Sequence, residues 1–137
     1  MTDYTVISKF RNKEQCQYLI DKLREKGKTC FSFLDMPADP NNPEGDAEEQ
    51  MKAFESTKDF FNNEHFQKIF KKDLGGLKNA REVIMLLPAG NSAHMEAGIA
   101  YGLGKKLILI GEPEKPESLY LAFDECYKSM DEFLKSI

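Results

Sequence analysis

A carboxylate at Glu96 follows a glycine-containing turn in the stretch LPAGNSAHMEAGIAYGLGKK, residues 87–106. Pro88 ends an apolar run, and Gly90, Asn91 and Ser92 can form a turn in which Ser92 is the N-cap of a following helix. Glu96 then lies about one turn inside that helix, where the positive end of the helix dipole favours the ionised form. An ionised carboxylate there can attack or stabilise a cationic carbon.

Ordinary structural roles compete with this interpretation. Acidic residues are common near helix starts for dipole reasons alone, and small residues such as Gly98 let a helix lie close to a sheet. His94 is two residues from Glu96, so the two side chains do not share a face of a regular helix. His94 could still border a ligand, and the free N–H groups at the helix start could bind a phosphate or another anion.

The apolar pattern predicts a scaffold for this segment. Near-continuous apolar runs are typical of strands buried on both faces of a parallel sheet, and a helix between two such runs favours a right-handed crossover. Five strands are expected, at residues 4–9, 29–34, 82–87, 106–110 and around 125–127. We therefore predict an α/β fold in a single domain, residues 1–137, with a doubly wound, flavodoxin/Rossmann-like sheet of five parallel strands.

Helices are expected in the connections between these strands. Apolar residues recur at helical spacing, and asparagine and glycine mark the expected ends. The expected helices run from about Asn12 to Gly27, over 48–74 with a break at Asn62 and Asn63 and an end at Gly75 and Gly76, over 92–103, near 117–122, and from Ser129 or Met130. Residues 35–49 remain as a long loop, and loops of this length are often binding or lid elements.

The predicted sheet indicates where a ligand would bind. In open parallel sheets, ligands bind outside the carboxyl ends of the strands, where the strand order reverses. Three expected strands end at polar or glycine-rich residues that could meet there. We therefore expect substrate contacts from Ser8, Lys9, Phe10, Asp35, Gly90, Asn91 and Ser92.

Charge limits the class of ligand. The net charge is −4, but residues 35–50 hold six acids and no base. We expect this acidic segment to lie beside the pocket, where it would repel a long nucleic acid and tolerate a single nucleotide. Cys16, Cys30 and Cys126 have no C-x-x-C spacing, so we expect neither a disulfide framework nor a metal site.

The chain lacks the patterns that indicate a membrane or secreted protein. No stretch approaches the roughly 18 to 20 uncharged apolar residues of a membrane span, and the first residues lack the layout of a secretory signal. We therefore expect a cytoplasmic protein with no membrane partner.

The reactive segment resembles the signature of the nucleoside 2-deoxyribosyltransferase-like family. The family pattern E-x-G-x-A is matched by EAGIA at residues 96–100, and Gly104 and Lys105 match the G-K pair before the next strand. The form S-x-H-x-E-A-G at residues 92–98 is similar to a bacterial and phage subgroup. The end of the chain, YLAFDECYKSMDEFL, resembles the family's closing elements.

The resemblance implies a reaction. Glu96 would attack C1′ of a deoxyribonucleoside or deoxyribonucleotide, expel the base and form a covalent deoxyribosyl-enzyme, which a second base or water then resolves. Gly90, Asn91 and Ser92 would bind the sugar or its 5′-phosphate. The residues that follow the first strand would close over the substrate. The resemblance also implies a homo-oligomer whose subunits complete each other's sites, and no cofactor.

Three departures from the family pattern keep alternatives open. Ala80-Arg81 stands where relatives carry an aspartate, Pro88-Ala89 where a second acid often occurs, and Ser8-Lys9 where glycine and proline are usual. The acid that protonates the leaving base could be His94, Asp35, Tyr4 or a group from a neighbouring subunit. The alternative function is a non-catalytic nucleotide-binding or sensing domain. A receiver-type or flavodoxin-like interaction module is disfavoured by the residues after the first strand.

Overall fold

The computed structural model describes all 137 residues, and its centre is a five-stranded sheet in the order β2-β1-β3-β4-β5. Every neighbouring pair is parallel. The order reverses between β1 and β3, which is where a doubly wound sheet opens a crevice. This confirms the predicted fold class. The strands are β1 (Thr2–Ile7), β2 (Cys30–Ser32), β3 (Ala80–Leu86), β4 (Lys106–Ile110) and β5 (Glu125–Tyr127).

Five α-helices and four short 3-10 turns connect the strands. The helices are α1 (Lys13–Glu25), α2 (Ala47–Glu55), α3 (Glu64–Lys78), α4 (Asn91–Gly102) and α5 (Met130–Ser136). The 3-10 turns are η1 (Phe10–Asn12), η2 (Phe33–Asp35), η3 (Phe60–Asn62) and η4 (Ser118–Ala122). No helix is long and apolar enough to cross a membrane.

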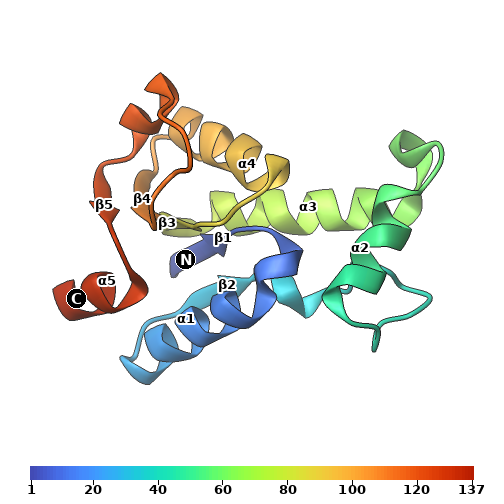
Figure 1. Cartoon of the computed structure of the whole chain (residues 1–137), viewed down its shortest axis with the longest axis horizontal. Coiled ribbons are helices and arrows are strands. Elements are labelled where there is room, and N and C mark those ends of the chain that lie inside the picture. Colours follow the sequence, from blue (N-terminus) through green and yellow to red (C-terminus); the bar gives the residue numbers. More distant parts are fainter.

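The helices cover both faces of the sheet (Figure 1). On one face, side chains such as Val6 and Ile84 pack against Leu19 and Leu23 of α1 and Phe133 of α5. On the other face, the sheet packs against Leu77 of α3 and three alanines of α4, Ala93, Ala97 and Ala100. Burial of both faces explains the near-continuous apolar runs of β3 and β4.

The expected ends of two helices are wrong. Helix α3 continues through Gly75 and Gly76 to Lys78. Gly76 is needed for contact rather than termination, since a Cβ there would lie 2.6 Å from Cδ1 of Phe31. Helix α4 begins at Asn91 with Gly90 as its N-cap, so Ser92 is not the cap, and no side chain caps this helix. The first N–H groups of α4 are therefore left for another acceptor.

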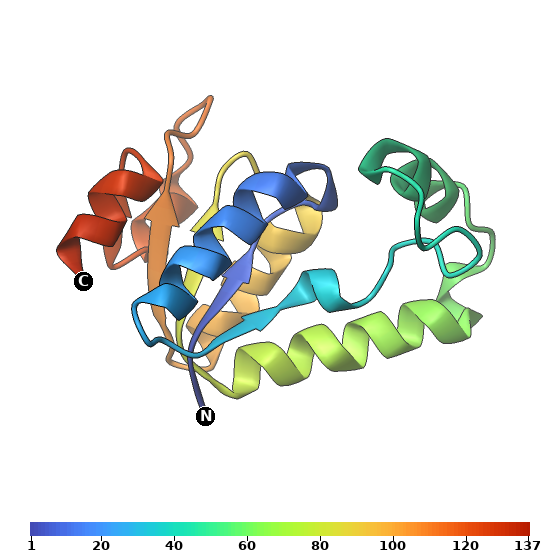
Figure 2. The ribbon, with the colours of Figure 1, turned by 90° about the horizontal axis from the view of Figure 1, so that it is seen from below.

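Helix α2 stands apart from the sheet, beside the N-terminal end of α3 (Figure 2). The region expected to be helical over 48–74 is divided between α2 and α3, and the predicted break is longer than two residues. Asn63 begins α3 by accepting a hydrogen bond from the Phe66 amide at 3.0 Å. The buried Gln50 of α2 holds the preceding loop, because its side chain accepts from the Ala38 amide at 2.9 Å and donates to Gly45 O at 2.8 Å.

Candidate active site

A cavity of about 350 Å³ lies at the carboxyl ends of β1 and β3. Its walls come from the residues after β1, from the segment after β2, from α2 and α3, and from the start of α4. Segments that are distant in sequence meet here because β1 and β3 are adjacent parallel strands. The acidic segment borders the cavity through Met36 and Ala38.

Seven of the nine residues predicted from the sequence line this cavity. They come from only two segments, the residues after β1 and the beginning of α4. The seven are Ser8, Lys9, Phe10, Gly90, Asn91, Ser92 and Glu96. The topological rule for open parallel sheets therefore explains why these residues line one cavity.

Glu96 is half-buried in the cavity wall. Burial, and to a smaller extent the charge of Asp73, raise the pKa of the Glu96 carboxyl to about 8. The helix dipole was expected to favour the ionised form. Glu96 is the sixth residue of α4, and the dipole acts mainly within the first turn. The loss of solvent around the carboxyl therefore decides the direction of its pKa shift.

Asp73 is a second acid in the cavity, and it is absent from the residues predicted from the sequence. It is half-buried on α3, and burial raises its pKa to about 6, while the charge of Lys72 acts in the opposite direction. Asp73 continues the inward-facing stripe of Phe66, Ile69 and Leu77. An acidic residue at a helix position where the pattern predicts an apolar one is the feature of the sequence that could have identified Asp73.

The titration of Glu96 depends on Asp73, because the charge of Asp73 adds to the burial that raises the pKa of Glu96. Two carboxyl groups that interact in one poorly solvated cavity lose their protons in two steps that belong to the pair. The pKa values of about 8 and about 6 leave one proton on the pair near neutral pH. By these values the proton lies mainly on Glu96, and Asp73 is mainly the anion. A pair in this state contains one acid and one anion.

Ser8 holds the cavity wall together. Its buried hydroxyl donates to Leu86 O at 2.7 Å and lies 3.1 Å from Pro88 O. The side-chain amide of Asn12 donates to the same hydroxyl at 3.3 Å. These bonds tie the end of β1 to the end of β3. The Ser8 hydroxyl is therefore engaged with the protein rather than presented to a ligand.

Lys9 and the start of α4 form the part of the cavity suited to an anion. Lys9 is half-buried and lines the cavity with Asn91 and Ser92. The uncapped N–H groups of α4 are partial positive charges, and a lysine beside them adds a full one.

Two predicted residues lie elsewhere. His94 faces a separate cavity between α4 and η4, with Nδ1 2.8 Å from Gly90 O and Nε2 3.0 Å from the Tyr120 hydroxyl. Asp35 is exposed and lines a different groove beside α1. Neither side chain shares a cavity with Glu96, which agrees with the expectation that His94 and Glu96 lie on different faces of the helix.

Tyr4, another candidate for the acid, is also outside the cavity. It is buried in the core against Phe133, with the ring centroids 6.0 Å apart. Burial raises the pKa of Tyr4 to about 12. None of these three candidates lines the cavity of Glu96, whereas Asp73, which was not among them, does.

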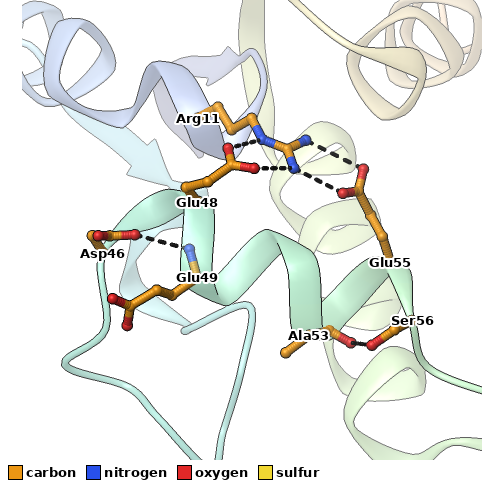
Figure 3. Close-up of polar contacts among 7 residues, drawn as sticks. All are labelled: Arg11, Asp46, Glu48, Glu49, Ala53, Glu55 and Ser56. Atoms are coloured by element: carbon orange, nitrogen blue, oxygen red, sulfur yellow. Dashed lines mark hydrogen bonds and ion pairs between the residues drawn. The ribbon is translucent and has the colours of Figure 1, made fainter.

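Arg11 joins two walls of the cavity, as Figure 3 shows. Its Nε lies 2.6 Å from Oε2 of Glu48, and its Nη2 lies 2.8 Å from Oε1 of Glu55. The Arg11 guanidinium lowers the pKa of both carboxyls. No group of three or more His, Cys, Asp or Glu side chains is arranged to hold a metal ion.

Comparison with known proteins finds solved structures of similar fold but no family that matches in sequence. No protein-family model matches the chain, and no curated protein matches it in sequence. The chain is similar in structure to the 2-deoxyribosyltransferase of the psychrotolerant bacterium Bacillus psychrosaccharolyticus, with a TM-score of 0.63 and 18% identity over 96% of this chain and 90% of that chain.

A second solved structure has the same arrangement. The CMP N-glycosidase BcmB of Clostridium botulinum is similar with a TM-score of 0.56 and 19% identity, over 98% of this chain and 97% of that chain. Likeness at this identity shows a shared fold. The more specific resemblance to the S-x-H-x-E-A-G subgroup rests on residues 92–98 alone.

Proposed function

We propose that the chain is an enzyme of N-glycosidic bonds that acts on nucleosides or nucleoside 5′-monophosphates. The observation that carries this proposal is the pair of acids, Glu96 and Asp73, in one cavity at the carboxyl ends of β1 and β3. Retaining cleavage of a glycosidic bond needs two carboxyl groups in different protonation states. A 2-deoxyribosyltransferase and a CMP N-glycosidase of similar fold add support.

Glu96 acts as the nucleophile in this proposal. Its ionised oxygen bonds to C1′ of the sugar while the bond from C1′ to the base nitrogen breaks. The electron pair of that bond leaves with the base, and Asp73 transfers a proton to the base nitrogen. In the reacting form the proton of the pair therefore lies on Asp73 and Glu96 is ionised. This is the minor of the two singly protonated forms, because the pKa of Glu96 is about 8 and that of Asp73 about 6. The negative charge of Glu96 stabilises the oxocarbenium-like transition state.

The second step releases the sugar. Water, or the nitrogen of a second base, attacks C1′ and displaces the Glu96 carboxylate, while Asp73 accepts the proton of the attacking group. Water gives hydrolysis and a second base gives transfer. Both outcomes retain the configuration at C1′, since two displacements occur at the same carbon.

The rest of the cavity suits the other parts of such a substrate. Lys9 and the uncapped start of α4 can hold a 5′-phosphate or a 5′-hydroxyl. The apolar walls contributed by Phe10, Met51 and Phe54 can pack against a base. Sites for small molecules typically have apolar walls with a few polar groups at defined positions.

The test is release of free base. We would incubate the chain with deoxynucleosides, deoxynucleoside 5′-monophosphates and CMP, with and without a second base, and separate the products by chromatography. Glu96→Ala and Asp73→Asn should abolish release, while Glu14→Gln, an exposed acid of α1 outside the cavity, should not. The proposal fails if the unaltered chain releases no base, or if Glu96→Ala releases as much.

A non-catalytic nucleotide-binding domain is the second candidate. The raised pKa of Glu96, about 8, favours this candidate in one respect, because a neutral carboxyl donates a hydrogen bond and does not attack carbon. Calorimetry would then detect nucleotide binding without turnover. Glu96→Gln, which keeps a hydrogen-bond donor, would leave the affinity near that of the unaltered chain.

We also propose that the chain self-associates through the outer face of α4 and η4. Met95, Tyr101, Leu119 and Leu121 are exposed there. The helix α4 carries no lysine, arginine or aspartate. A large uncharged apolar surface favours an equally uncharged partner, and a second copy of the same face supplies one.

A further inference from the structure

We propose that Arg11 is a positioning residue that holds α2 as a closed lid over Glu96 and Asp73, with Glu48 and Glu55 as its latch. The proposal concerns how the cavity is closed. It does not depend on which reaction the cavity supports.

The geometry of the latch matches the planar guanidinium of arginine. Glu48 and Glu55 lie two turns apart on one face of α2, and each places both carboxylate oxygens on the same guanidinium. The planar group of Arg11 presents five donors in a fixed fork, so it can hold two carboxylates at once (Figure 3). A lysine ammonium is a point charge and lacks this fork.

Arg11 is the polar link between α2 and the β1–α1 side of the cavity. No other side-chain hydrogen bond or ion pair joins α2 to that side. Helix α2 also packs directly on η1, the turn that contains Arg11. Phe54 stacks on Phe66 of α3, with ring centroids 4.2 Å apart and planes 11° apart, and Gln50 holds the preceding loop. Removal of the Arg11 ion pairs would therefore leave α2 without a polar side-chain link to this side of the cavity.

The face of α2 that carries the latch also forms the roof of the cavity. Met51 lies between Glu48 and Glu55 in sequence, at helical spacing from both, and lines the cavity with Phe54 and Glu55. Opening α2 would expose the two acids to water. The charged groups that line the cavity are Lys9, Arg11, Glu55, Lys72, Asp73 and Glu96.

The first test measures the opening of α2 directly. Hydrogen exchange of the α2 amides reports local opening, and that of β3 reports unfolding of the core. Arg11→Met should make α2 exchange about fivefold faster or more and leave β3 unchanged. Arg11→Lys, which keeps the positive charge but lacks the planar fork, should give an intermediate rate. Exchange of α2 at the unaltered rate in Arg11→Met would overturn the proposal.

Lys106 offers a matched control. It also bridges two carboxylates, Glu82 at 3.1 Å and Glu125, but it does so on neighbouring strands away from the cavity. Lys106→Met removes the same kind of ion pairing and should leave the exchange of α2 unchanged. An equal acceleration in both variants would mean general destabilisation and would also overturn the lid.

The second test measures hydration of the acids. Loss of the positive charge of Arg11 would by itself raise the pKa of Glu96, whereas entry of water lowers the pKa toward its ordinary value. A titration of the Glu96 side chain by NMR should therefore show a lower pKa in Arg11→Met. An unchanged or higher pKa would contradict closure by α2. Neither test requires turnover, so absence of base release would reject the proposed reaction and leave the lid standing.

Discussion

Asp73 on α3 and Glu96 on α4 line one cavity, and the charge of Asp73 adds to the burial that raises the pKa of Glu96. The pair is built from two helices that pack on the same face of the sheet. Its protonation is therefore a property of the tertiary structure.

Base release should depend on pH as a bell-shaped curve. The reactive form has one proton on the pair, held by Asp73, and it is a constant minor fraction of the singly protonated pair. The singly protonated pair is dominant between the pKa values of about 6 and about 8. Release should fall on both sides of that range when kcat/KM is measured against pH. Equal rates at about pH 5 and about pH 7 would contradict the assignment of the pair.

Glu96→Gln should make the chain more stable at high pH. The pKa of Glu96 is raised on folding, from an ordinary 4.5 to about 8, so the folded state binds this proton more tightly than the unfolded state does. The resulting stability is fully present below about 4.5 and is lost as the pH rises through about 8. Glutamine carries no charge and avoids this loss.

Urea unfolding at two pH values measures the effect. Because Glu96 is only half-buried, we expect the Gln variant to exceed the unaltered chain by on the order of 2 kcal/mol at about pH 9 and to be close to it at about pH 5. Glu14→Gln is the control and should change neither value. A destabilised Gln variant at high pH would show that the Glu96 anion is well solvated in the folded chain.

Two adjacent glycines of α3 should respond in opposite directions to alanine. A Cβ on Gly76 would lie 2.6 Å from the ring of Phe31, while one on Gly75 would have no atom within 4 Å. Gly76→Ala should cost about 1 to 3 kcal/mol of unfolding free energy through overpacking. Gly75→Ala should gain about 0.5 to 1 kcal/mol, since alanine favours a helix interior. Thermal unfolding distinguishes the two, and equal effects would contradict the packing of α3 on β2.

Replacing two leucines of η4 should prevent self-association. Leu119 and Leu121 are 77% and 89% exposed, so a Leu119→Ser, Leu121→Ser variant has little effect on the fold of one chain. Sedimentation should show an oligomer for the unaltered chain and a monomer for the variant. A monomeric unaltered chain at high concentration would disprove the interface.

The fold and one half of the cavity could be predicted from the sequence for identifiable reasons. Strands buried on both faces have a strong apolar signal, and the rule that ligands bind at strand ends then predicts that Ser8 and Glu96 border one cavity. Asp73 was not predicted because α3 was interpreted only as a helix that packs against the rest of the protein. Asp35 was misplaced because its side chain lines a different groove, although Phe33 and Met36 on either side of it line the cavity.

The contacts of Arg11 could not be predicted from the sequence either. Its partners lie in α2, which is separated from Arg11 by the whole of α1 and β2. Only the three-dimensional path of residues 36–62 brings the guanidinium to two carboxylates.

The part of the cavity wall formed by α2 belongs to a single connection, the one between β2 and β3. Helix α2 lies between β2, an edge strand, and α3, and it contributes to no strand of the sheet. Residues 36–62 can therefore be exchanged for a longer or shorter segment without shifting the register of any strand pair. A different segment in place of residues 36–62 would change the substrates that the cavity accepts and would leave Glu96 and Asp73 where they are.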